Sequence, residues 1–263
     1  MNKTSFIVAL CGLLMAPLAL ANDDCRQQMP SWLEQAHPGY AKQSVTLQDE
    51  RGSYRVENYE GICKRWPARP HLALVAIPLV RTVEDGYGET DLEVLVVDNR
   101  SQRIVARLVE SNRLDWDAIR VDGVAFDTAP YRLNGNDIAF GIRISRRNGS
   151  GPNPFYETSL SLYELKAQRL RPLLSELVMT SSGAEWDMQC TGEFGEKAGI
   201  LIVTEKQGKA GYRDLLFKRS VTSSRREGMA ESCETVEEKS DQEQYRISYG
   251  EERYLLPMEL SPL

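Results

Sequence analysis

The feature that most constrains the fold of this chain is an alternation of apolar and polar residues with a period of two. It recurs in seven short segments, at residues 53–59, 91–97, 138–144, 159–163, 199–204, 214–218 and 245–249. Such alternation is typical of β-strands that bury one face and expose the other. Turn signals separate the segments, as at Asp85-Gly86, Asn134-Gly135 and Gln207-Gly208. The pattern predicts an all-β fold built from antiparallel meanders.

An internal repeat strengthens this prediction. Residues 89–94 align with 157–162, and Gln-Arg-Ile at 102–104 aligns with Gln-Arg-Leu at 168–170. Downstream, Asp-Trp-Asp at 115–117 aligns with Glu-Trp-Asp at 185–187, and a shorter third copy starts near residue 200. Repeated meanders bury the face of each unit against the next unit, as in propellers and solenoids.

The repeated unit resembles a blade of the FG-GAP and VCBS-type β-propellers of bacterial secreted proteins. The likeness lies in an apolar strand, a Gly-containing acidic loop, the strand Asp-Leu-Glu-Val-Leu-Val-Val-Asp at 91–98, a tight turn and a strand at 102–108, and it covers about residues 70–220. It implies a propeller-like fold, and a two-sheet β-sandwich is the alternative. The Asp-rich calcium loop of that family is missing, because residues 84–89 read Glu-Asp-Gly-Tyr-Gly-Glu. We therefore expect no metal and no cofactor.

The first 21 residues are predicted to be a secretory signal peptide. Lys3 precedes an apolar run over residues 6–20, and Ala19-Leu20-Ala21 provides a small-residue cleavage site. The remaining residues 22–263 are expected to form a single β-repeat domain in the bacterial periplasm, or secreted, with no membrane insertion after cleavage. Within it we distinguish an N-terminal disulfide-linked segment at 22–70, a repeat core at 71–220, and an acidic loop with closing strands at 221–263.

One short helix is expected near the new N-terminus, at residues 30–36. Ser31 is a suitable N-cap with Glu34 three residues later, and Pro38-Gly39 would stop the helix.

Four cysteines remain once Cys11 leaves with the signal peptide. An even number of cysteines in an exported chain indicates two disulfides, which could pair in three ways. We favour Cys25–Cys63 and Cys190–Cys233, each of which closes a loop of about 40 residues. A zinc-binding or catalytic role is the competing interpretation, but the chain has no Cys-x-x-Cys spacing and only two histidines, His37 and His71. Both histidines are expected at the surface or in turns.

The charge balance argues against nucleic acid as a partner. The full chain has a formal net charge of −6, and loss of the signal peptide removes one further positive charge. Phosphate backbones require a basic surface.

Carboxylates beside tryptophan are the best enzymatic candidates. They lie at equivalent points of the repeat and are Asp115, Asp117, Glu185 and Asp187. Glycosidases use two carboxyl groups together with aromatic residues that stack on sugar rings. These residues therefore define the alternative function, an envelope glycan hydrolase. The other interpretation is structural, with tryptophan filling a gap between units and aspartate capping a turn.

A basic segment next to Cys63 provides the candidate binding residues. Three cations and one tryptophan lie on a Pro-containing loop, and they are Lys64, Arg65, Trp66 and Arg69. Such a set could hold an anionic or aromatic partner; the alternative is a solvated linker with Trp66 half-buried. Residues 225–244 are strongly acidic and are expected to form a loop or exposed hairpin.

The sequence as a whole favours a non-catalytic periplasmic binding or interaction protein on a disulfide-linked β scaffold. The expected partner is another protein or an envelope component, and an inhibitor or immunity-type protein would be one form of this function. The glycan hydrolase is the alternative.

Overall fold

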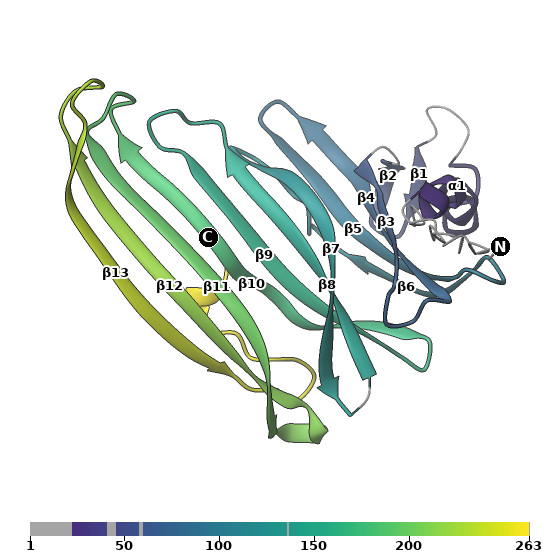
Figure 1. Cartoon of the computed structure of the whole chain (residues 1–263). Helices are drawn as coiled ribbons and strands as arrows, with labels where there is room; N and C mark the ends of the chain where they lie inside the picture. Colours follow the sequence, from purple (N-terminus) through teal and green to yellow (C-terminus); the bar gives the residue numbers. More distant parts are fainter. Residues whose placement is uncertain (1–22, 41–45, 58–59, 136, 263) are drawn as a thin grey trace, which may run out of the picture.

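The described part of the chain folds into two antiparallel sheets and one α-helix (Figure 1). This computed structural model describes residues 23–40, 46–57, 60–135 and 137–262. The predicted signal peptide at residues 1–21 lies outside these residues.

The first sheet has six strands and is covered by the helix α1 (Asp23–Ala36). Its main order is β1-β2-β4-β5-β6, and β3 also pairs with β4. The strands are β1 (Leu47–Asp49), β2 (Gly52–Val56), β3 (Ile62–Arg65), β4 (Leu72–Glu84), β5 (Tyr87–Asp98) and β6 (Arg103–Glu110). The central strands β4 and β5 are buried on both faces, because α1 packs on one face and the second sheet on the other.

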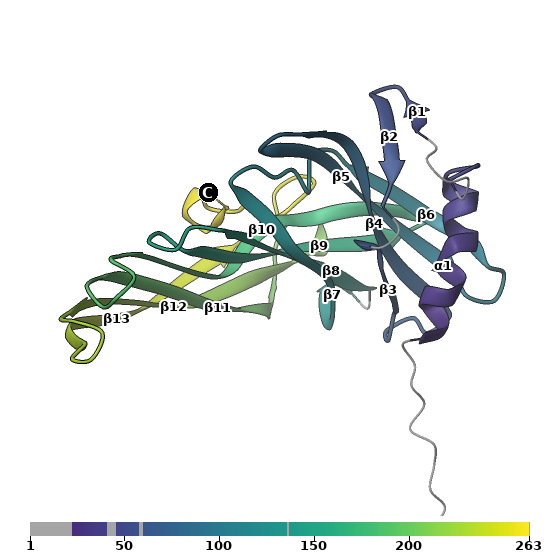
Figure 2. The ribbon, with the colours of Figure 1, turned by 90° about the horizontal axis from the view of Figure 1, so that it is seen from above.

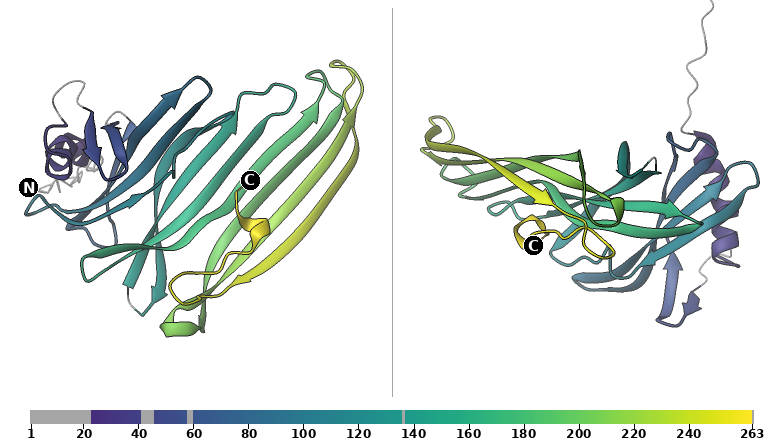
Figure 3. Two further views of the ribbon diagram at one scale, coloured as in Figure 1. Left: turned by 180° about the vertical axis from the view of Figure 1, so that it is seen from behind. Right: turned by 90° about the horizontal axis from the view of Figure 1, so that it is seen from below.

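The second sheet is a continuous seven-stranded meander that curls strongly (Figure 3). Each strand pairs with the next along the chain, and the strands are β7 (Ile119–Asn134), β8 (Asp137–Asn148), β9 (Phe155–Lys166), β10 (Arg169–Trp186), β11 (Gly192–Gln207), β12 (Arg213–Glu227) and β13 (Glu234–Ile247). Viewed from above, its last strands extend far from α1 (Figure 2).

Three apolar clusters form the core. The first lies between the two sheets, where Trp66 and Leu74 meet Phe140 and Tyr163. In the second, residues of β8–β10 and β12, such as Leu162 and Phe217, are joined by Tyr249, Tyr254 and Leu260 from the C-terminal segment. The third joins α1 to the first sheet. Burial at roughly 25 cal/mol per Å² of apolar surface makes these clusters the main source of stability.

The helix begins earlier than predicted. It starts at Asp23 and runs through Pro30, so Ser31 lies inside it and its hydroxyl donates a hydrogen bond to the carbonyl of Gln28 at 2.8 Å. The predicted N-cap at Ser31 is therefore wrong. The longer helix brings Cys25 to its disulfide partner and buries Met29, Trp32 and Leu33 against the sheet, which outweighs the local cost of an internal proline.

The prediction of an all-β chain with repeated antiparallel meanders and a short N-terminal helix is confirmed. The sequence repeat corresponds to β4-β5-β6 and β8-β9-β10. The finer arrangement differs from propeller blades, because β7 to β13 join edge to edge in a single sheet. Within the second sheet β8-β9-β10 therefore continues laterally into β11-β12-β13, whereas β4-β5-β6 lies in the first sheet and packs against the second.

Both predicted disulfides are confirmed. Cys25 pairs with Cys63 at a Cα–Cα distance of 6.0 Å, and Cys190 pairs with Cys233 at 5.5 Å. Such bonds are compatible with an oxidising compartment outside the cytoplasm. Within the described residues, no helix has the length and apolar character needed to cross a membrane.

Candidate functional site

The outer half of the second sheet projects beyond the core, and we call residues 181–197 and 221–241 the distal platform. They form the outer parts of β10, β11, β12 and β13 and the turns between them. Cys190 is the only buried residue in these two ranges, all of which the structure describes. These outer strand segments bury almost nothing and contribute little to the core. Their two open faces are therefore the main candidate surface for external contacts.

One face of the distal platform, the Lys197 face, carries charges around a bare floor. Cross-strand pairing places Gly183, Gly195 and Ser223 in one row, with Lys239 at its end. A Cβ on Gly195 would meet nothing within 4 Å, so the floor is open backbone. Phe155 borders the resulting hollow of about 690 Å³.

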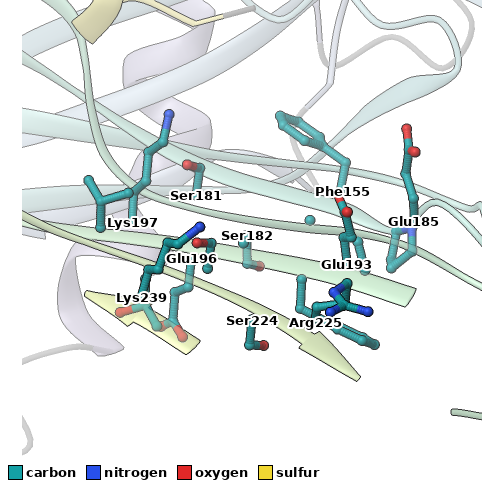
Figure 4. A pocket seen from close by; sticks show the side chains of 18 of the residues that line it. Phe155, Ser181, Ser182, Glu185, Glu193, Glu196, Lys197, Ser224, Arg225 and Lys239 are labelled. Carbon is teal, nitrogen blue, oxygen red and sulfur yellow. The ribbon is translucent and has the colours of Figure 1, made fainter. Parts of the chain in front are cut away.

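The charged side chains of the Lys197 face lie at the two ends of this hollow. Figure 4 shows Lys197 and Glu185 pointing to the same side of the sheet, whereas Glu196 points to the other side. The Glu237 carboxylate forms an ion pair with the Lys239 amine at 2.6 Å, and its other oxygen lies 3.7 Å from Nε of Arg225. Positive and negative groups are therefore interspersed, and the face has no single dominant charge.

The opposite face, the Phe194 face, carries aromatic and arginine side chains. The rings of Trp186 and Phe194 lie 5.8 Å apart, and the guanidinium of Arg226 lies 4.6 Å from the Phe194 ring centre. These three side chains line a hollow of about 660 Å³. Tyr156, which is 38% exposed, and Arg147 line it as well. Aromatic and arginine side chains are the types most enriched among residues that dominate protein–protein binding energy.

The tip of the distal platform is held by the second disulfide. Cys190 lies in the β10–β11 turn and Cys233 lies just before β13, so the bond joins two neighbouring hairpins at their ends. The Asp187 carboxylate accepts hydrogen bonds from the backbone N–H of Gln189 and Cys190 at 2.9 and 2.8 Å. These backbone donors hold the pKa of Asp187 below its usual range. The predicted acidic loop at 225–244 is largely the exposed β12–β13 hairpin.

The predicted basic segment lies beside the core between the sheets. Trp66 is fully buried and its ring packs edge-on against Phe140 at 5.2 Å. Arg69 covers the Trp66 ring at 4.9 Å and donates a hydrogen bond to the carbonyl of Leu165, while the Lys64 amine lies 3.4 Å from the carbonyl of Phe126. Arg65 is exposed on β3. The tryptophan is thus part of the core, and a ligand role for Lys64, Arg65, Trp66 and Arg69 stays a prediction.

The four predicted catalytic carboxylates are not gathered in a single cleft. Asp115 accepts hydrogen bonds from the Thr90 backbone at 2.7 Å and the Asn112 side chain at 2.8 Å, and Asp117 accepts one from the Ile119 backbone at 2.8 Å. Both lie in a hollow beside Trp116, whereas Glu185 lines the Lys197 face and Asp187 caps the platform turn.

The two tryptophans also act as structural elements. Trp116 packs directly on Gly88, and the Trp186 indole donates a hydrogen bond to the carbonyl of Gly151 at 2.8 Å. Trp116 thus covers a glycine of the hairpin that precedes it in the repeat, and Trp186 is hydrogen-bonded to the corresponding β8–β9 turn. This geometry favours the structural interpretation over the glycan hydrolase.

His37 lies in the bend that follows α1 and is buried, with only 1% exposed, so it is not at the surface. Its Nε2 lies 2.6 Å from a carboxylate oxygen of Glu93, and its Nδ1 lies 2.9 Å from the Tyr54 hydroxyl. Glu93 is also paired with Arg107, which donates a hydrogen bond to the carbonyl of Ala36 at the end of α1. The group fixes the helix to the sheet; the His37 and Glu93 side chains are fully buried in it, whereas Arg107 is partly exposed.

A charged cluster lies where the two sheets meet. Arg113 forms an ion pair with Glu176 of β10 and donates a hydrogen bond to Ser161 of β9 at 2.6 Å. Burial raises the pKa of Glu110, although Tyr163 donates a hydrogen bond to it. Burial also raises the pKa of Glu157, which is 4% exposed. Among the described residues, no three His, Cys, Asp or Glu side chains are arranged to hold a metal ion.

The sequence interpretation missed the platform residues Phe194, Arg226 and Tyr156. The available signal was negative: residues 219–227 read Arg-Ser-Val-Thr-Ser-Ser-Arg-Arg-Glu, a strand-length segment with little apolar alternation. A strand exposed on both faces leaves no period-two pattern to detect.

Comparison of the chain with models of known protein families, with curated proteins and with solved structures finds no match.

Proposed function

We propose that this protein is a non-catalytic periplasmic binding protein and that the distal platform is its contact surface. The partner is another protein or an envelope component, and an inhibitor or immunity-type protein would be one form of this function. The observation that carries the proposal is the distal platform itself, where only the disulfide residue Cys190 is buried.

The construction of the distal platform supports a role in recognition. Exposed sheets with little core beneath them open easily, because few buried contacts oppose local unfolding. Here the two outermost hairpins are joined by Cys190–Cys233, which restricts that opening. A preorganised surface loses less conformational entropy when a partner binds.

The Phe194 face is the better candidate for a protein partner. Trp186, Phe194 and Tyr156 provide rigid apolar area, and Arg147 and Arg226 provide planar donors at the same hollow. Residues of these types form the energetic centre of protein interfaces, with polar residues around them. The Thr222 and Ser224 side chains lie on this face and provide polar surroundings.

Export to the periplasm rests on the predicted signal peptide at 1–21 together with the two disulfides. Four paired cysteines in a chain of this size are expected in an oxidising compartment.

The test uses adjacent residues of β12 that point to opposite faces. Ser224 pairs with Phe194, whereas Ser223 pairs with Gly195 on the Lys197 face. The wild-type chain and the variants Ser224→Arg and Ser223→Arg are immobilised in equal amounts and exposed to periplasmic extract of the native host. Bound proteins and glycans are then quantified by mass spectrometry.

We expect a specific component to bind the wild type and Ser223→Arg, and to bind Ser224→Arg at least tenfold more weakly. Circular dichroism establishes that all three chains are folded. The absence of any reproducible component with folded protein would contradict the proposal. A component that binds both variants equally well would show that the Phe194 face is not the contact surface.

A further inference from the structure

Another hollow lies away from the distal platform, at the β9–β10 hairpin. It has a volume of about 650 Å³ and is bordered by Glu164, Lys166, Arg169, Arg171, Pro172, Glu252 and Arg253. Four of these seven residues are cations and two are acids, in a chain whose formal net charge is −6. The hollow is therefore a local positive site on an acidic protein.

The strand register explains why these side chains converge. Lys166 pairs directly with Arg169 across the hairpin, and Glu164 pairs directly with Arg171. Residues two apart on a strand share a face, so all four side chains lie on one side of the hairpin. The turn residues Ala167 and Gln168 have φ values of 47° and 60°, as in the tight turns that fix such a register.

Glu164 is already neutralised within the structure. It accepts hydrogen bonds from Arg171 at 2.5 Å and from the Tyr212 hydroxyl at 2.7 Å, and it is only 6% exposed. The inner pair of the hairpin, Glu164 and Arg171, therefore has no net charge. Glu252 is the remaining acid at the hollow, and it lies on an exposed loop.

The outer pair of the hairpin, Lys166 and Arg169, consists of two positive charges. Lys166 and Arg169 are both exposed, and neither makes an ion pair with a described residue. Like charges at directly opposed positions of an antiparallel pair repel each other. An anion between them would replace that repulsion with two attractions.

The third cation comes from a loop that is held in place. Gly250 donates a backbone hydrogen bond to Arg253 at 2.8 Å, and the next residue, Tyr254, bonds to the carbonyl of Leu173 at 2.7 Å. The Tyr254 hydroxyl donates to the carbonyl of Arg213 at 2.7 Å, and Tyr254 is buried. The backbone at Arg253 is thus held beside the hairpin, and its exposed side chain borders the hollow.

We propose that this hollow is a binding site for a phosphate group, contacted by Lys166, Arg169 and Arg253. Guanidinium groups match the oxygens of phosphate with paired hydrogen bonds, and a lysine adds a compact charge. A hollow of this size accepts a small phosphorylated molecule or the headgroup of an anionic lipid. The site is separate from the distal platform, so either proposal can fail without the other.

The test uses the full chain, with pyrophosphate and phosphatidylglycerol vesicles as probes. Binding of pyrophosphate is measured by calorimetry, and binding of vesicles by co-sedimentation against phosphatidylcholine vesicles. The double variant Lys166→Glu/Arg169→Glu is compared with Arg100→Glu/Lys218→Glu, which changes the net charge equally at two exposed cations elsewhere. Arg253→Ala serves as a second variant in the exposed loop and keeps the test valid if the hairpin variant does not fold.

We expect the wild type and the Arg100→Glu/Lys218→Glu control to bind at least one probe, and the hairpin variant to bind it at least tenfold more weakly. Arg253→Ala should weaken binding about threefold to tenfold. Binding of pyrophosphate alone would identify a soluble phosphate ligand, and binding of vesicles alone would identify a lipid headgroup. Absence of binding to either probe, or equal losses in the hairpin variant and the control, would overturn the proposal.

Discussion

At the scale of single residues, the two histidines have opposite environments. His37 is buried against Glu93, whereas His71 is exposed at the start of β4. We expect His37→Ala to lower the free energy of unfolding by about 3 kcal/mol, because it removes one partner of a buried ionisable pair. His71→Ala is the control and should change it by less than about 0.5 kcal/mol. Urea unfolding at neutral pH measures both, and equal effects would contradict a structural role for His37.

Glu157 should make stability depend on pH. Burial raises its pKa, so the unfolded chain releases this proton at a lower pH than the folded chain does. The free energy of unfolding therefore falls as the pH rises from the pKa of Glu157 in the unfolded chain to its higher pKa in the folded chain. It is not regained at higher pH. Glu157→Gln removes the buried charge and should be more stable than the wild type at pH 8, by about 1 kcal/mol.

This difference in unfolding free energy should vanish near pH 3, below the ordinary pKa of glutamate, where Glu157 is protonated in both the folded and the unfolded wild type. Urea unfolding across this pH range measures it, with Glu185→Gln as the control because Glu185 of β10 is exposed on the same face of the sheet as Glu157. A Glu157→Gln variant that is less stable than the wild type at pH 8 would show that its ion contacts outweigh the burial cost.

At the scale of elements, β11 carries two glycines with different surroundings. A Cβ on Gly199 would collide with the ring of Phe217, whereas one on Gly195 would meet open space. We expect Gly199→Ala to destabilise the protein by about 1–3 kcal/mol, because Phe217 is fully buried and has to shift. Gly195→Ala should be neutral or slightly stabilising. Thermal unfolding of the two variants distinguishes the sites, and similar melting temperatures would show that Phe217 moves freely.

The same strand illustrates what the sequence could and could not predict. Residues 199–204 alternate because their inner side chains, such as Leu201, pack on the second cluster, and this part of β11 was predicted. The strand continues outward from residue 199 to Gly192 without an apolar face, and that part was missed. Periodicity reports burial, so it detects a strand only where a core lies beside it.

Pairing of distant residues was predictable only in part. The cysteine number predicted two disulfides, and the favoured one of the three possible pairings is confirmed. The environment of Trp66 did not follow, because a basic segment looks like a surface until a second sheet covers its one aromatic residue. The Lys166–Arg169 pair depends on strand register, which the sequence alone leaves open.

At the scale of the whole molecule, the second sheet ends in a long unprotected edge. β13 has 14 residues, and it carries acidic side chains at Glu234, Glu237, Glu238, Asp241 and Glu243. Charged residues on an edge strand oppose pairing with a second copy. We expect Glu237→Thr/Glu238→Thr/Asp241→Thr to self-associate with increasing concentration while the wild type stays monomeric.

Sedimentation velocity measures this association. The control is Glu205→Thr/Glu231→Thr/Glu251→Thr, which removes the same number of exposed charges away from the edge. Association of the control to the same extent would attribute the effect to net charge and not to the edge.

The length of β10 has a mechanical consequence. Its 18 residues span roughly 60 Å, from the core to the tip, and they pair with β9 along most of that distance. A pull directed along the strands would load many ladder hydrogen bonds at once, as in shear. A pull directed across them would peel β13 away one rung at a time. The protein should therefore resist force strongly in one direction and yield readily in the other.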